Sequence, residues 1–187
     1  MEVFLQHVGS PGNHDIAFTV TKRRDIDDVA QSLPPDAPER PWFEGQSLRN
    51  AFPGGSFNCW GVPPGAEPRF RATNVGDLVL FFPQAGVNGA LEQIGVIKAL
   101  CPVQCWDASR VLWPSTPGDR LFPHVFFFKT EIGYREWSSF LDDVDYSPDW
   151  DPRGWYRRIA SRRLHKWGGA EGYLSFLRGS CGFHTIG

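Results

Sequence analysis

Apolar residues in the middle of the chain gather in short runs that glycine and other turn-forming residues separate. Leu78–Phe82 is a continuous apolar run after the turn Gly76-Asp77, a pattern typical of a buried strand. A hairpin-type loop at Ala85–Gly89 leads to Gln93–Lys98, which predicts the return strand. Phe122–Phe128 predicts another buried strand. With 20 Gly and 16 Pro, the pattern favours short strands and many loops over a bundle of long helices.

The first 57 residues show a weaker pattern. Phe18–Thr21 alternates apolar and polar residues and predicts a strand. Asp25–Ala30 predicts the first turns of a short helix, because acidic residues in a first turn complement the helix dipole. Residues 33–57 are rich in proline, glycine and charge, and predict a long irregular insertion. Four aromatic residues are expected to tie this insertion to the body of the protein: Trp42, Phe43, Phe52 and Phe57.

The last 40 residues are basic and predict helices. Arg157–Lys166 is expected to be helical, with Ile159 and Leu164 as core contacts and the basic residues as polar positions. Gly168-Gly169 is expected to end this helix, and Ala170–Leu177 to form a last short one. Two further segments are predicted as loops: Pro114–Arg120 and Asp149–Gly154.

These elements together predict one α+β domain over residues 1–187. Its expected core is a strongly bent mixed sheet or open barrel with flanking helices. The net charge of −2 excludes a globally basic nucleic-acid binder, so any such surface must come from local clusters of Lys and Arg. The aromatic content of 14% exceeds the need of a plain core, so some aromatic residues are expected to face a ligand.

The cysteines and the N-terminus bear on location and cofactors. The four cysteines show neither a disulfide pattern nor zinc spacing, so we expect reduced thiols and no metal or other cofactor. No basic segment followed by a long apolar run opens the sequence, and no stretch is long enough to span a membrane. The expectation is a cytoplasmic protein without a membrane partner.

Two tryptophans stand out as candidate ligand-binding residues. Trp60 is followed by Gly61, and Trp113 by a proline, and each ends an apolar run in a setting that resembles a loop. Residues placed in this way can form the walls of a pocket. Two facing indoles can hold a flat, uncharged ring, and stacking on one aromatic side chain contributes about 1–3 kcal/mol per nucleobase.

An ordered set of motifs between residues 16 and 130 resembles the YTH domain, within the PUA-like group that includes EVE and ASCH domains. The matching segments are Phe18-x-Val20-x-Lys22 with Asp27-Asp28-Val29, Asn58-Cys59-Trp60, Gly76–Phe82, Gly95-Val96-Ile97, Val111-Leu112-Trp113 and Phe122–Phe128. Such domains read modified bases in RNA, and their relatives in bacterial and archaeal restriction systems read modified DNA. The sequence departs from the YTH pattern in its longer insertion and in Gly61.

The resemblance implies a site for one flipped base. Trp60 and Trp113 would sandwich the base, Asp28 would meet its ring edge, and the carbonyl near Gly61 would accept the hydrogen of a methylated amine. Leu121, or else Phe122, would supply a third wall. Two residues that flank the first wall complete the expected base site: Asn58 and Cys59. Extrusion of a base from a duplex costs a few kcal/mol, which the stacking would offset.

Two basic clusters are candidate phosphate contacts, which would position a strand without reading it. The first precedes Asp28: Lys22, Arg23 and Arg24. The second lies in the predicted C-terminal helix: Arg157, Arg158, Arg162, Arg163 and Lys166. His124, inside an apolar strand, is expected to be a structural histidine.

The sequence thus predicts a non-catalytic nucleic-acid-binding module that recognises N6-methyladenine or a modified cytosine. One expected role is the specificity domain of a modification-dependent restriction system, with a motor or nuclease elsewhere. The Gly-Asp strand start and the long insertion favour DNA over RNA. The alternatives are an RNA reader, an aromatic cage for methyl-lysine or another cation, and a nuclease using Asp77, Glu92 and Lys98. The end at Gly187 suggests a domain of a longer polypeptide, or a free-standing protein.

Overall fold

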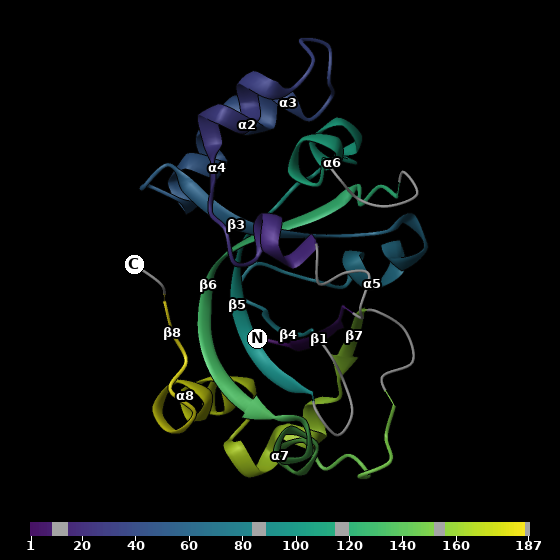
Figure 1. The fold of residues 1–187 in the computed structure, drawn as a ribbon, viewed down its shortest axis with the longest axis vertical. Coiled ribbons are helices and arrows are strands. Elements are labelled where there is room, and N and C mark those ends of the chain that lie inside the picture. The colour runs from purple at the N-terminus through teal and green to yellow at the C-terminus, as the bar shows by residue number, and fades with distance from the viewer. Residues whose placement is uncertain (9–14, 84–88, 115–119, 152–155, 186–187) are drawn as a thin grey trace. The chain divides into compact units, whose positions relative to one another are not determined.

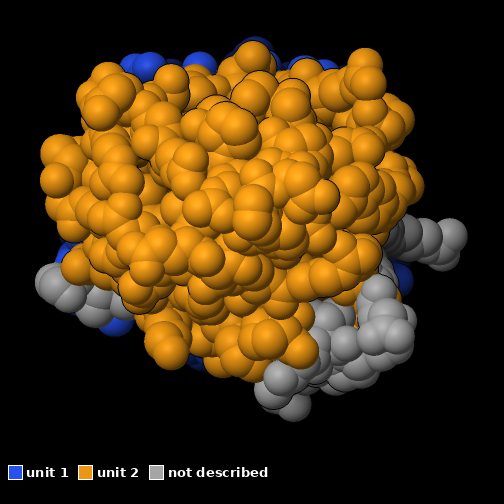
Figure 2. All heavy atoms as spheres, turned by 90° about the horizontal axis from the view of Figure 1, so that it is seen from above, with its two compact units in different colours: residues 1–13, 76–96, 130–187 blue, residues 14–75, 97–129 orange. Residues whose placement is uncertain are grey.

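The computed structural model describes residues 1–8, 15–83, 89–114, 120–151 and 156–185. The chain forms two compact units. Unit 1 contains residues 1–13, 76–96 and 130–187, and unit 2 contains residues 14–75 and 97–129 (Figure 2). The predicted loops at 85–89, 114–120 and 149–154 lie largely outside the described residues. That residues 1–187 are a single domain stays a prediction.

Eight strands form one mixed sheet in the order β2-β3-β6-β5-β4-β1-β7, with β8 paired to β6 (Figure 1). β1 and β4 are parallel, and the other described ladders are antiparallel. The sheet does not close on itself, and helices flank it, so the α+β prediction is confirmed. Two strands, β5 and β6, each begin in one unit and end in the other. The strands are β1 (Val3–His7), β2 (Arg24–Asp25), β3 (Ser56–Val62), β4 (Leu78–Phe82), β5 (Ala90–Leu100), β6 (His124–Glu136), β7 (Tyr156–Ile159) and β8 (His184–Thr185).

Unit 1 is built on β1, which pairs with β4 on one side and β7 on the other. Alternate residues such as Val3, Leu5 and Leu80 point to one face of these strands and are buried in one core. Three helical elements complete that core: α7 (Trp137–Asp143), the 3₁₀ helix η3 (Ser161–Trp167) and α8 (Ala170–Ser180). None of the described helices is both long and apolar enough to cross a membrane.

Unit 2 is built on β3, which pairs with β2 and β6. Residues on one face of β3, including Phe57 and Cys59, are buried against helical residues. Besides the helical residues 15–19, unit 2 contains the helices α2 (Ile26–Ser32), α3 (Arg40–Glu44), α4 (Gln46–Ala51), the 3₁₀ helix η1 (Pro64–Ala66), α5 (Glu67–Arg71) and α6 (Trp106–Leu112). The predicted start of α2 is confirmed, because the Asp25 carboxylate accepts the backbone N–H groups of Asp27 and Asp28 at 2.8 and 3.1 Å.

The prediction of an irregular insertion at 33–57 was wrong in one respect, because the segment contains α3 and α4. Pro41 lies in the first turn of α3, where proline favours a helix since its missing N–H needs no partner there. The expected anchoring is confirmed: Phe43, Phe52 and Phe57 are fully buried, and Trp42 packs against the same core.

Two other assignments were also wrong. Residues 15–19 are helical rather than part of a strand, and the N–H groups of Val20 and Thr21 donate to the Ile16 carbonyl. Four alternating residues are too few to separate a strand from the end of a short helix. Residues 157–166 form β7 and η3 instead of one α-helix, because residues 156–159 pair with β1. Ile159 and Leu164 are nevertheless buried, as expected.

The strands at 78–82 and 93–98 are confirmed as β4 and β5, and the last helix as α8. β6 begins at His124, two residues later than predicted. Phe122 and Pro123 are instead held by α6: the Phe122 N–H donates to Ser109 Oγ at 2.8 Å, and the Pro123 carbonyl accepts the Cys105 N–H at 2.8 Å.

Candidate nucleic-acid interface

An aromatic cluster in unit 2 contains both tryptophans that the sequence singles out. Trp60 lies in β3, paired with Phe126, and so occupies a strand rather than the loop that was expected. Trp113 follows the last residue of α6, and Phe122 lies two residues before β6. The Trp113 and Phe122 rings are 5.4 Å apart between centroids and nearly perpendicular, at 75°. Residues from three separate segments thus meet at one place.

The two indoles do not face each other. Their centroids are 6.4 Å apart and their planes meet at 81°, so the parallel arrangement that we expected was wrong. The nearly parallel pair is Trp60 with Phe122, at 6.4 Å and 25°. The rings are almost completely buried: Trp60 is 5%, Trp113 3% and Phe122 4% exposed. That these rings bind a base stays a prediction, and Phe122 joins the tryptophans as a candidate wall.

Gly61 makes this close packing possible. A Cβ atom at position 61 would lie 2.5 Å from Phe122 Cβ, 2.8 Å from the Phe122 carbonyl oxygen and 2.9 Å from Trp113 Cη2. Carbon atoms do not approach this closely, so only glycine allows Phe122 and Trp113 to pack against the strand. The sequence suggested a role only for the carbonyl near this residue.

Helix α6, which leads to Trp113, is held at both ends by residues from elsewhere in unit 2. At its N-terminus the buried Glu39 carboxylate accepts the N–H groups of Asp107 and Ala108, both at 2.8 Å. At its C-terminus the Arg24 guanidinium donates to the carbonyls of Val111 and Leu112 at 3.3 and 3.4 Å. These contacts match the helix dipole at both ends, and they fix the segment that carries Trp113.

Glu39 was missed by sequence reasoning, since a glutamate in a charged, proline-rich segment gives no sign that it is buried. Arg24 binds the C-terminus of α6, and its expected contact with phosphates stays a prediction. A positioning role for Arg24 is therefore what the described contacts support.

Glu39→Ala is expected to lower the free energy of unfolding by about 1–2 kcal/mol, because the N-terminus of α6 loses its cap. Chemical denaturation monitored by circular dichroism measures this change. Glu44→Ala is the matched control, since Glu44 forms an exposed pair with Arg40 at 2.7 Å, which contributes about 0–1 kcal/mol. Equal effects of the two changes would show that Glu39 does not stabilise α6.

The other residues expected to contact the base differ in how far they are buried. Asn58 is buried, and its amide donates to the carbonyls of Thr19 and Val20 at 3.3 and 2.9 Å, so it anchors the segment before β2. Cys59 lies on the opposite face of β3 from Trp60, and burial raises the pKa of its thiol. Asp28 is exposed in the first turn of α2, and Leu121 is half-buried beside Phe122.

Of the first basic cluster, Lys22 and Arg23 are exposed in the turn before β2. The second cluster belongs to unit 1. Arg158 pairs with Glu2 at 3.9 Å, and the Arg157 guanidinium lies 5.7 Å from the centroid of the Trp150 ring. The structure therefore places the two clusters in different units, with Arg162 exposed on η3.

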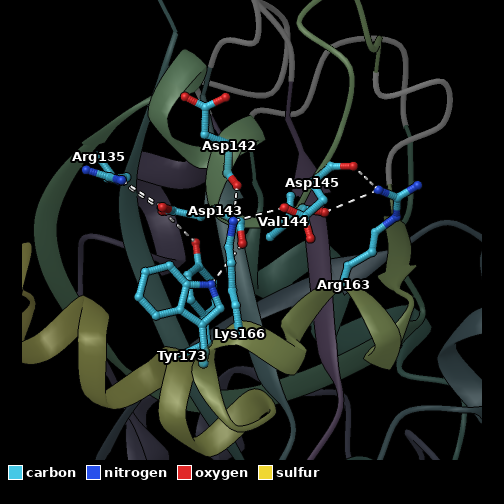
Figure 3. Close-up of polar contacts among 9 residues, drawn as sticks. Arg135, Asp142, Asp143, Val144, Asp145, Arg163, Lys166 and Tyr173 are labelled. Atoms are coloured by element: carbon cyan, nitrogen blue, oxygen red, sulfur yellow. Dashed lines mark hydrogen bonds and ion pairs between the residues drawn. The ribbon is translucent and has the colours of Figure 1, made fainter.

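Arg163 and Lys166 bind the C-terminal end of α7 (Figure 3). Arg163 donates to the carbonyls of Val144 and Asp145, and its guanidinium lies 4.2 Å from the centroid of the Tyr146 ring. The Lys166 ammonium donates to the Asp142 carbonyl and pairs with the Asp145 carboxylate at 2.9 Å. Cations at a helix C-terminus stabilise its unpaired carbonyls. These two residues thus have structural partners within unit 1.

A buried carboxylate at the same end of α7 completes this arrangement. Asp143 accepts two hydrogen bonds from the Arg135 guanidinium, at 2.7 and 2.9 Å, and one from the Tyr173 hydroxyl at 3.4 Å (Figure 3). Burial, followed by the charge of Asp143, raises the pKa of Tyr173 well above its usual value. The Trp167 indole N–H donates to the Asp143 carbonyl at 2.8 Å. This network joins α7 to η3 and α8.

The residues considered for a nuclease give little support to that alternative. Asp77 is buried, and its carboxylate accepts the Glu2 N–H at 2.7 Å. Glu92 and Lys98 are exposed on β5. Among the described residues, no group of three or more His, Cys, Asp and Glu side chains could hold a metal ion.

A comparison with solved structures bears on what this arrangement resembles. The chain is similar to the N-terminal domain of Thermococcus gammatolerans McrB bound to m5C DNA, with a TM-score of 0.63 and 15% sequence identity. The likeness covers 95% of this chain and 98% of that domain. The two share a fold. No protein-family model matches the chain, and no curated protein does either.

The McrB domain extends the resemblance that the motifs suggested, because it too is a domain seen with methylated nucleic acid. At 15% identity the likeness establishes the fold and assigns no residue. Membership of the YTH or EVE families stays a prediction.

Proposed function

We propose that the chain is a non-catalytic DNA-binding module that recognises one methylated base, and that it serves as the specificity domain of a modification-dependent restriction system in the cytoplasm. The observation that carries this proposal is the fold, shared over 95% of the chain with a domain bound to methylated DNA. The motor or nuclease would be another domain or subunit. Methylcytosine is the first candidate base because the McrB domain is bound to m5C DNA, and N6-methyladenine is the second.

The aromatic cluster provides the stacking surfaces for this recognition. Trp60, Trp113 and Phe122 offer three ring faces or edges within 6.4 Å of one another. Since these rings are almost fully buried, a base can stack on Trp60 only if Trp113 or Phe122 rotates away. Such changes of side-chain rotamer are common when interfaces form. We propose that the base takes the position that one of these rings now fills.

A methyl group by itself adds only about 0.8 kcal/mol through burial of apolar surface. Discrimination between methylated and unmethylated bases therefore needs a shaped pocket, in which one methyl group contributes about 1–3 kcal/mol. A tightly packed cluster around a glycine is suited to this, because a base without the methyl group would fill such a pocket incompletely.

A binding panel tests the proposal. Matched oligonucleotides would carry one 5-methylcytosine, one N6-methyladenine or no modification, as single-stranded DNA, duplex DNA and RNA at one salt concentration. Fluorescence anisotropy is expected to show the tightest binding to methylated DNA. Preference for methylated RNA would refute the DNA-binding proposal and support the RNA-reader alternative. Equal binding to all oligonucleotides, or binding to methyl-lysine peptides alone, would refute it.

Lys22→Ala is expected to weaken the binding of methylated and unmethylated DNA alike, because a phosphate contact carries no sequence information. The slope of the logarithm of the association constant against the logarithm of the salt concentration is negative. Its magnitude should decrease by about 0.9 for duplex DNA. Lys166→Ala is the control: its ammonium is engaged with α7 and Asp145, so the slope should stay unchanged. An unchanged slope in Lys22→Ala would place Lys22 outside the interface.

A further inference from the structure

His124 shares a face of the sheet with Trp60, one member of the aromatic cluster, by the register of the strands. It is the first residue of β6 and pairs with Val62, while Trp60 pairs with Phe126. Because residues two apart on a strand share a face, His124 and Trp60 lie on the same face as diagonal neighbours. Diagonal neighbours are about 7–8 Å apart, within reach of aromatic and other long side chains.

The imidazole of His124 is buried and incompletely satisfied. The residue is 5% exposed, and its Nε2 atom has no hydrogen-bond partner among the described residues. Its ring packs on Phe70 of α5, with centroids 5.2 Å apart and a tilt of 36°. A buried polar atom without a partner is costly, and native proteins contain few of them. The structural role that the sequence suggested does not explain this atom.

Burial favours the neutral form of this ring. Burial lowers the pKa of His124, while Glu67 raises it and Arg71 lowers it, both from α5. A neutral imidazole has one N–H donor and one nitrogen with a free lone pair. The buried Nε2 is a hydrogen-bond acceptor in the tautomer that carries the proton on Nδ1.

We propose that His124 is a specificity-determining residue of the base site, whose Nε2 accepts a hydrogen bond from the exocyclic amine of the bound base. This inference rests on the proposed function. Cytosine and adenine carry such an amine. Thymine carries a carbonyl oxygen at the position where cytosine has its amine. The aromatic rings would then select for a flat methylated base, and His124 would select for an amino base.

5-Methylcytosine and thymine provide the test, since both carry the 5-methyl group and differ at the 4-position, where one has an amine and the other an oxygen, and at N3. Each would be placed in the same single-stranded oligonucleotide, so that pairing to a partner strand does not differ. The unaltered chain is expected to bind the 5-methylcytosine oligonucleotide about tenfold more tightly. His124→Phe keeps a flat ring against Phe70 and removes the acceptor, so it should bring this ratio close to one.

The ratio between 5-methylcytosine and cytosine provides the internal control, because it should be retained in His124→Phe. His165→Phe, at an exposed position of η3, should change neither ratio. His124→Gln, which keeps a polar acceptor, should restore part of the discrimination and guards against a phenylalanine variant that folds poorly. If the panel selects N6-methyladenine, 6-methoxypurine replaces thymine as the analogue without the amine hydrogen.

An unchanged ratio of 5-methylcytosine to thymine in a folded His124→Phe variant would overturn the assignment of His124 and leave the proposed function standing. Equal binding of the two bases by the unaltered chain would also overturn it. If the unaltered chain bound no methylated oligonucleotide more tightly than an unmodified one, the proposed function itself would fail. The two failures are therefore distinguishable.

Discussion

Trp60→Leu and Trp113→Leu are each expected to lower the affinity for methylated DNA by about 5- to 150-fold, since stacking of a base on one aromatic ring contributes about 1–3 kcal/mol. Affinity for unmodified DNA should change little, so the selectivity is lost with the stacking. Leucine is preferable to alanine, because both tryptophans are buried and truncation to alanine would cost about 3–5 kcal/mol of folding stability. Anisotropy titrations at a temperature well below the unfolding midpoint measure the effect.

Trp106→Leu is the matched control for this pair. Trp106 lies at the start of α6, the helix that ends at Trp113, and its indole N–H donates to the Gln104 side chain at 3.1 Å. It is only half-buried, so its replacement should leave the selectivity for methylated DNA unchanged. Retained selectivity in both cluster variants would show that the base binds elsewhere.

Gly61→Ala is expected to have the second large effect. The new methyl group would meet the Phe122 backbone and Cβ as well as Trp113, at 2.5–2.9 Å, so either β3 or the Phe122 segment must shift. Overpacking of this kind costs about 1–3 kcal/mol, and thermal or chemical denaturation would show the loss. Because the shift displaces two of the three rings, selectivity for methylated DNA should decrease as well.

Gly54→Ala and Gly65→Ala provide controls in the same unit, since a Cβ atom at either position meets nothing within 4 Å. Each should change the free energy of unfolding by less than about 0.5 kcal/mol. A Gly61→Ala variant as stable and as selective as these controls would mean that the packing around position 61 is looser than the structure indicates.

The strands β4 and β5 were predictable because their information is local: a continuous apolar run, a turn at Gly76 with a φ of 95°, and a return strand. Residues 157–159 were not, because a short basic segment becomes a strand only through pairing with β1, about 150 residues earlier. The same holds for α3. From the sequence alone, its proline predicts a break in a helix. In the structure it occupies the first turn, where proline is favourable.

The sequence indicated which residues form the candidate site better than it indicated how their rings are arranged. Adjacent Gly and Pro residues drew attention to Trp60 and Trp113, and the structure does bring them together. The angle between their planes depends on the side chain of Phe122 and on the two ends of α6, which no local pattern encodes. Arg24 shows the same limit: a sequence identifies a basic residue, but whether it meets a phosphate or a helix end depends on the tertiary fold.

The division of the chain between its two units has a practical consequence. Unit 1 is assembled from three stretches of sequence and unit 2 from two, and β5 and β6 cross the boundary within single strands. No single proteolytic cleavage can release either unit as one continuous fragment, and no truncated gene can encode one alone. Transfer of the proposed recognition function to another protein would therefore require the entire sequence as one cassette, joined at its ends.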